Sequence, residues 1–91
     1  MAFGLYFTPN SFTPAQYDEA IQRLEAAGAA NPPGRLYHVA LEINGQISVY
    51  DTWESMEQFE AFGKTLLPIL SELGVDAGQP MVMPAHNVIE G

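Results

Sequence analysis

Hydrophobic and polar residues along this chain follow two different periods. Apolar and polar positions alternate in Ala2–Thr8, Leu36–Ile43 and Gln46–Trp53, and the extended stretch Gln79–Glu90 alternates in a similar way. Successive side chains of a β-strand point to opposite faces, so this two-residue period predicts four strands. Two of the intervening stretches carry the 3.6-residue period of amphipathic helices instead.

Both predicted helices have recognisable ends. The first begins at Thr13, a capping residue followed by proline, and ends near Gly28. The second begins at the capping residue Ser55 and ends near Gly74. Their apolar stripes consist of Tyr17, Ala20, Ile21, Leu24 and Ala27, and of Phe59, Phe62, Leu66, Ile69, Leu70 and Leu73.

The order strand, helix, strand, strand, helix, strand is typical of the ferredoxin-like α+β fold. We expect residues 1–91 to form a single domain, with a four-stranded antiparallel sheet and two helices on one face. Pro80 and Pro84 favour an edge position for the last strand, because proline cannot donate a ladder hydrogen bond.

The dipeptide Asn44-Gly45 predicts a two-residue hairpin turn, because both central residues of a type I′ turn need positive φ. Counting back from this turn, His38 faces Asp51 and Leu36 faces Trp53 on one face of the sheet. The same register pairs Ala40 with Val49. A β-bulge near Leu36–His38 would move His38 to the helix face and remove this candidate site.

Tyr37, Val39 and Leu41 share the other face of the hairpin, and we expect them to pack against the helices. The face with His38 and Trp53 then needs a different cover. Two sheets facing each other would supply it, so we expect a homodimer that forms an α/β barrel.

The predicted pairing of His38 with Asp51 is the sharpest candidate for chemistry. A carboxylate beside an imidazole orients it and fixes its tautomer, which is the arrangement of a general base with its orienting group. The alternative is a structural hydrogen bond between two polar side chains inside a barrel. Beyond this catalytic pair, the residues expected to bind substrate are Trp53, Leu36, Ala40, Val49, His86 and Tyr6.

A metal site is not expected. His38, His86 and Asp51 resemble a two-histidine, one-carboxylate ligand set in composition. They come from separate elements, however, and have no local ligand spacing.

The composition narrows the possible partners. The net charge is -8, with only three lysines and arginines, so neither a nucleic acid nor an anionic membrane surface is expected as a partner. The absence of cysteine excludes disulfides and thiol nucleophiles. No apolar run reaches the length of about 18 residues that a membrane span needs, and no signal peptide is evident, so we expect a cytoplasmic protein.

Two segments carry a resemblance to a known family. The segment Asp51–Phe59, with a tryptophan at the strand end followed by Glu-Ser, and the segment Pro84–Ile89 are similar to the dimeric α/β-barrel proteins of the antibiotic-biosynthesis-monooxygenase type. The resemblance covers nearly the whole chain and implies a pocket-lining role for Trp53. Members of that family include cofactor-free oxygenases, haem-degrading enzymes, isomerases and decarboxylases.

The haem-degrading members carry a histidine on the second helix, where this chain has Phe62–Thr65 without histidine. We therefore expect no cofactor. The favoured hypothesis is a cofactor-independent monooxygenase or isomerase that acts on a small apolar molecule, aromatic or polyketide-like, with His38 as the base. The competing hypothesis is a non-catalytic ligand-binding or assembly module with the same fold.

Overall fold

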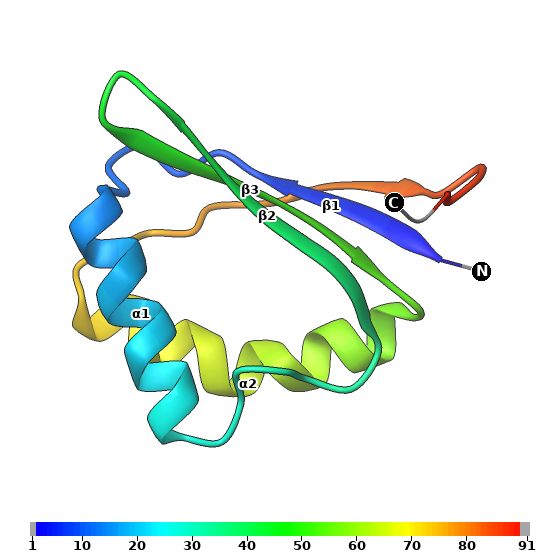
Figure 1. The fold of residues 1–91 in the computed structure, drawn as a ribbon, viewed down its shortest axis with the longest axis horizontal. Helices are drawn as coiled ribbons and strands as arrows, with labels where there is room; N and C mark the ends of the chain where they lie inside the picture. Colours follow the sequence, from blue (N-terminus) through cyan, green and yellow to red (C-terminus); the bar gives the residue numbers. More distant parts are fainter. Residues whose placement is uncertain (1, 90–91) are drawn as a thin grey trace.

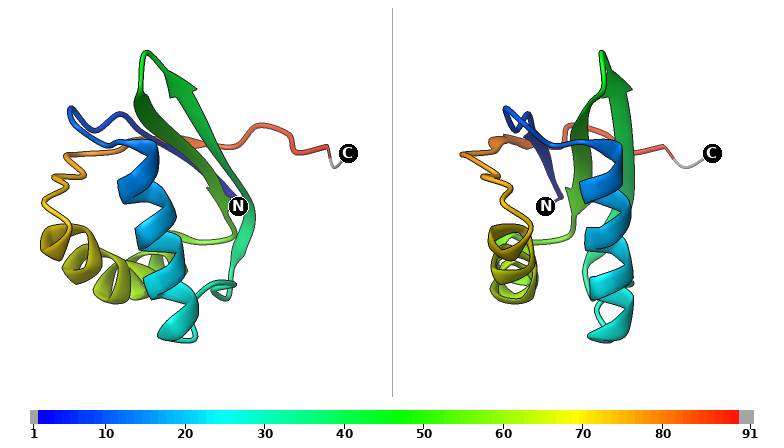
Figure 2. Two further views of the ribbon diagram at one scale, coloured as in Figure 1. Left: turned by 60° about the vertical axis from the view of Figure 1, so that its left-hand side comes forward. Right: turned by 90° about the vertical axis from the view of Figure 1, so that its left-hand side faces the viewer.

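The computed structural model describes residues 2–89, and its elements follow the predicted order (Figure 1). The three antiparallel pairings join the strands into one sheet with the order β2-β3-β1-β4. Both helices cover the same face of this sheet (Figures 1 and 2). The elements are β1 (Phe3–Phe7), α1 (Pro14–Ala26), β2 (Arg35–Ile43), β3 (Gln46–Trp53), α2 (Met56–Glu72) and β4 (Met81–Pro84). The ferredoxin-like α+β fold is confirmed.

The last strand is shorter than predicted. β4 occupies the predicted edge position beside β1 but has four residues, whereas the expected strand ran from Gln79 to Glu90. Glu90 lies outside the described residues. Within residues 2–89, no helix is long and apolar enough to cross a membrane.

The predicted helix ends are confirmed. Thr13 and Gln16 form the capping box of α1, with each side chain accepting from the other residue's backbone N–H. The Gln16 side chain also donates to the Leu73 carbonyl over 3.1 Å, which ties the start of α1 to the end of α2. Gly28 and Gly74 follow the two helices with positive φ, as C-terminal glycines do.

The hairpin register is confirmed over most of its length. Asn44 and Gly45 have φ values of 53° and 77°, as a type I′ turn requires. His38 pairs with Asp51, as counted from this turn. Ala40 pairs with Val49 as well.

A β-bulge at Leu36 ends the regular register. Tyr37 pairs with Thr52 as predicted, but Arg35 takes the position opposite Trp53, and the predicted pairing of Leu36 with Trp53 is wrong. The preceding residue, Gly34, accepts a hydrogen bond of 2.8 Å from the backbone N–H of Glu54. This contact lies beyond the end of β3 and holds the start of β2 in place, so the extra residue bulges out of the ladder.

The helices cover the opposite face of the hairpin from the one expected. The face with Asp51 and Trp53 packs against the helices, whereas Tyr37 and Leu41 are exposed. The central strands explain this outcome, because β1 and β3 place their largest apolar side chains on the Trp53 face. β2 is an edge strand with apolar residues on both faces, so its pattern alone is ambiguous.

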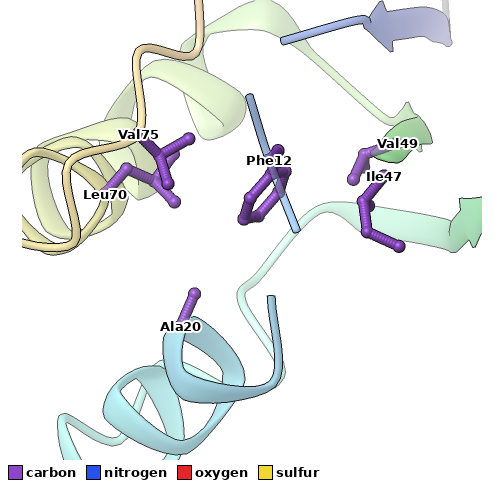
Figure 3. Close-up of a cluster of buried hydrophobic side chains, with 6 residues drawn as sticks. All are labelled: Phe12, Ala20, Ile47, Val49, Leu70 and Val75. Atoms are coloured by element: carbon purple, nitrogen blue, oxygen red, sulfur yellow. The ribbon is translucent and has the colours of Figure 1, made fainter. Parts of the chain in front are cut away.

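Two clusters of buried side chains hold the helices to the sheet. Figure 3 shows the first, in which Phe12 lies between Val49 of β3 and Leu70 of α2. Phe12 comes from the loop after β1, and its carbonyl accepts from the N–H of Ile47 over 2.7 Å. The second cluster contains Leu5, Leu24, Trp53 and Phe62, and Leu5 and Trp53 are fully buried.

Gly34 and Gly28 form a matched pair for testing the start of β2. Both have positive φ, but a Cβ at Gly34 would lie 2.8 Å from Gln58 Cβ, whereas a Cβ at Gly28 would meet nothing. Gly28→Ala should cost about 1–2 kcal/mol of backbone strain. Gly34→Ala should cost about 1–3 kcal/mol more from overpacking, measured as the free energy of unfolding in urea. Equal losses for the two variants would contradict this account.

Candidate active site

A cavity of about 500 Å³ lies between the sheet and the two helices, in the size range of small-molecule sites. Most of its wall is carbon, from Phe12 at the end near the turn of the hairpin to Leu24 and Phe62 near the other end. Exposed residues of α2, including Leu67 and Pro68, also line it, so the cavity reaches the surface along that helix. Its polar and charged lining residues are Tyr17, Arg35, His38, Asp51, Glu60 and Lys64.

Four side chains form a hydrogen-bonded chain at the sheet side of this cavity. His38 Nδ1 lies 2.5 Å from Asp51 Oδ1, and His38 Nε2 lies 2.7 Å from the hydroxyl oxygen of Tyr17. Trp53 Nε1 donates to the second carboxylate oxygen of Asp51 over 3.4 Å. Helix α1 thus supplies one member, β2 the second, and β3 the other two.

The chemistry of these groups sets the direction of the hydrogen bonds. An ionised carboxylate only accepts, so His38 Nδ1 carries the hydrogen that faces Asp51. In a neutral imidazole the other nitrogen is then an acceptor, and it receives the hydroxyl hydrogen of Tyr17. The rings of Tyr17 and His38 are 5° from parallel, with centroids 6.0 Å apart.

Burial raises the pKa of Tyr17 above its ordinary value. The negative charges of Asp51 and Asp18 act in the same direction, while the positive charge of Arg35 partly opposes them. The phenol therefore stays protonated at neutral pH. It is available there as a hydrogen-bond donor to His38 and as the polar group of α1 that lines the cavity.

The structure separates the sequence-predicted site residues into two groups. His38, Asp51 and Val49 line the cavity. Trp53 does not line it as predicted: its side chain is fully buried, and its indole N–H donates to Asp51. The other four predicted residues do not line this cavity. Ala40 packs against the first core cluster, and Leu36 is exposed at the bulge. Tyr6 lies against Tyr50 on the opposite face of the sheet, and His86 is exposed after β4.

Two polar residues of the cavity, Tyr17 and Arg35, were missed by the sequence reasoning. Tyr17 lies on the apolar stripe of α1, where an aromatic residue is expected to be core. Arg35 enters the cavity wall because of the bulge at Leu36, and only the Pro-Gly pair before it hinted at irregular backbone. Within residues 2–89, no three His, Cys, Asp or Glu side chains lie close enough to hold a metal ion.

No protein-family model and no curated protein matches this chain in sequence. Solved structures do match its fold. One is SnoaB, a cofactor-independent oxygenase from Streptomyces nogalater, with 21% identity over 99% of this chain and 96% of that one and a TM-score of 0.62. Another is a Caulobacter crescentus protein proposed to be an antibiotic biosynthesis monooxygenase, with 23% identity over 97% and 91% and a TM-score of 0.62.

A third match is the ActVA-Orf6 monooxygenase of Streptomyces coelicolor in complex with the ligand nanaomycin D, with 17% identity over 99% and 92% and a TM-score of 0.54. The chain has the fold of antibiotic biosynthesis monooxygenase-like proteins. Similarity at this level of identity establishes the fold, whereas function depends on the residues of the site.

Replacing Tyr17 by phenylalanine tests whether burial holds its hydroxyl in the neutral form. With the pKa of Tyr17 raised above 10.0, the folded protein keeps a proton that the unfolded chain releases. This contribution to stability is complete below about pH 10 and is lost as the pH rises through the folded pKa. We therefore expect the free energy of unfolding of the wild type, measured in urea, to fall more steeply above that pH than that of Tyr17→Phe.

The exposed Tyr37 provides the matched control. Tyr37→Phe removes a phenol from the other face of the sheet, away from the cavity, and is the comparison for losing one hydroxyl. If Tyr17→Phe and the wild type lose stability in parallel above that pH, Tyr17 does not titrate as inferred.

Proposed function

We propose that this protein is a small oxygenase that acts on an apolar, aromatic molecule without a bound cofactor. The observation that carries the proposal is the chain Tyr17–His38–Asp51, which places a base and its orienting carboxylate at the wall of an otherwise apolar cavity. Asp51 is buried and His38 is half-buried at this wall, which is the arrangement of a general base held by its orienting group.

Proton abstraction is the first step. Because Tyr17 occupies His38 Nε2, the proton leaves the substrate through the phenol: the Tyr17 oxygen accepts the substrate proton as its own hydrogen moves to Nε2. The Asp51 carboxylate stabilises the imidazolium that forms. The product of this step is a substrate carbanion or enolate.

Molecular oxygen is the second reactant. The carbanion adds O₂ to form a C–O bond, and the peroxide anion takes a proton from the Tyr17 hydroxyl as the hydrogen on His38 Nε2 returns to the Tyr17 oxygen. Loss of water from this hydroperoxide, with the second hydrogen of the same carbon, leaves a carbonyl group. The substrate CH₂ thus becomes C=O, one oxygen atom leaves as water, and the substrate supplies all the electrons.

The structural matches support this reaction class. SnoaB is named as a cofactor-independent oxygenase, and ActVA-Orf6 as a monooxygenase with nanaomycin D as a ligand. An isomerase would share the proton transfer but consume no oxygen. A binding or assembly module would share the cavity and would use the polar chain only as structure.

We further propose that two copies of this chain pair through the uncovered sheet face. Tyr37, Leu41 and Ile43 of β2 and Met81 of β4 are exposed there, each by half or more. Within residues 2–89, the strand positions on this face carry no charged side chain. The lack of charge on this face favours pairing there, because two copies that each have a net charge of -8 repel each other through their charged surfaces. Apolar exposure on this scale is typical of an interface.

Oxygen uptake with anthrone tests the reaction. The CH₂ of anthrone lies between two aromatic rings and is acidified by conjugation with the carbonyl, so it matches the proposed chemistry. We expect turnover above the uncatalysed rate, with one O₂ consumed per anthraquinone formed. His38→Gln and Tyr17→Phe should each reduce it by about 100-fold or more, as the loss of general acid–base catalysis does.

Tyr37→Phe is the control for removing a phenol away from the cavity, and it should keep wild-type turnover. Proton exchange at the anthrone CH₂ without oxygen uptake would contradict the oxygenase and support an isomerase. Binding of anthrone with no exchange and no uptake, unaffected by His38→Gln, would favour the non-catalytic module.

Light scattering after gel filtration tests the pairing. The wild type should elute with twice the mass of one chain, and Leu41→Glu should convert it to a monomer, because it places a carboxylate among the exposed apolar side chains of this face. Ala26→Glu puts the same charge on the exposed side of α1 and should leave the dimer intact. A wild-type monomer at micromolar concentration would contradict the proposal.

A further inference from the structure

The few positive charges of this chain are distributed unevenly. It has three lysines and arginines against eleven acidic residues. Arg23 lies on the surface of α1, where it forms ion pairs with Glu19 at 3.2 Å and Glu72 at 3.0 Å. The other two cations, Arg35 and Lys64, both line the cavity. Neither forms an ion pair with any residue in 2–89.

The structure holds the guanidinium of Arg35 in a defined place. The bulge at Leu36 turns Arg35 onto the cavity face, next to His38 along β2. Nη2 donates to the Ala30 carbonyl over 2.9 Å, and Cζ lies 6.0 Å from the centroid of the Phe62 ring. The side chain is partly buried, and within the described chain this carbonyl is its one hydrogen-bond partner. Its other donors are available to a ligand.

Within residues 2–89, no carboxylate of the cavity forms an ion pair with Arg35. Asp51 uses one oxygen for His38 and the other for Trp53. Glu60 is exposed on α2, one turn before Lys64, so its charge is screened by water and offset by that lysine. Arg35 is therefore the charged donor that the inner cavity offers to a bound molecule.

We infer that the natural substrate is an aromatic carboxylic acid whose carboxylate binds Arg35 and whose apolar body fills the cavity beside Tyr17 and His38. A planar guanidinium matches a carboxylate through two parallel hydrogen bonds. A phosphate dianion would call for more donors than this apolar wall provides.

This inference rests on the proposed function only in naming the ligand a substrate, so binding tests it without turnover. The probes are 2-naphthoate and its neutral isostere 2-naphthamide, measured by calorimetric titration. Wild-type protein should bind naphthoate at least tenfold more tightly than naphthamide. Arg35→Gln should remove this preference by weakening naphthoate about tenfold or more, while naphthamide binding stays unchanged and reports an intact fold. Arg35→Lys should keep part of the preference that Arg35→Gln loses, because lysine retains the positive charge but cannot form two parallel hydrogen bonds with a carboxylate.

Arg23→Gln is the matched control, since it removes the same charge from a site outside the cavity and should leave both affinities unchanged. Equal binding of the two probes by the wild type, or binding of neither, would overturn the inference. Equal weakening of both probes in Arg35→Gln would also overturn it, because Arg35 would then act through packing alone.

The same probes separate this inference from the proposed reaction. His38→Gln should keep the preference for naphthoate, because the acid group is bound by Arg35. A preference for naphthoate in a protein that does not turn over anthrone would support the carboxylate site and contradict the proposed oxygenase reaction. Turnover of anthrone without that preference would support the reaction and contradict the carboxylate site.

Discussion

The register of the β2–β3 hairpin is the constraint on which the site depends. The turn at Asn44-Gly45 can be made only with two residues at positive φ, and this chain has such residues at that one place between the strands. From there, regular pairing brings His38 opposite Asp51. A slip by one residue would turn every side chain of β2 to the other face, and the imidazole would leave the cavity. The chemistry of the site therefore depends on the backbone geometry of a turn that lies six residues from His38 and from Asp51.

The bulge at Leu36 then changes which residue joins this pair in the wall. In an unbroken ladder, Leu36 would stand opposite Trp53 and the cavity would be apolar at that end. With the bulge, Arg35 stands there, in contact with Phe62 and the Ala30 carbonyl. Bulges often lie next to active sites, where they redirect a side chain. Here one extra residue in β2 places the cation of Arg35 where an unbroken ladder would place the apolar side chain of Leu36.

The two faces of the sheet serve different purposes. The face toward the helices contains both core clusters and the cavity between them. A cavity of this size in so short a chain removes contacts that would otherwise stabilise the core. The opposite face, with exposed Tyr37 and Leu41, offers apolar area that a second copy would bury. Burial of this apolar area by pairing would thus offset the loss of core contacts that the cavity causes.

Local interactions made much of this protein predictable from its sequence. Helix caps such as Thr13, the hairpin turn and the pairing of His38 with Asp51 depend on residues close in sequence or on counting from a tight turn. Only the tertiary structure decided which sheet face the helices cover, because the apolar pattern of the edge strand β2 is ambiguous and the central strands decide. The partner of His38 Nε2 was equally beyond sequence reasoning, since Tyr17 lies 21 residues away on a helix whose rotation depends on packing. The position of Arg35 depends on a bulge that no periodicity reveals, because a single extra residue is set by how the two strand ends meet in space.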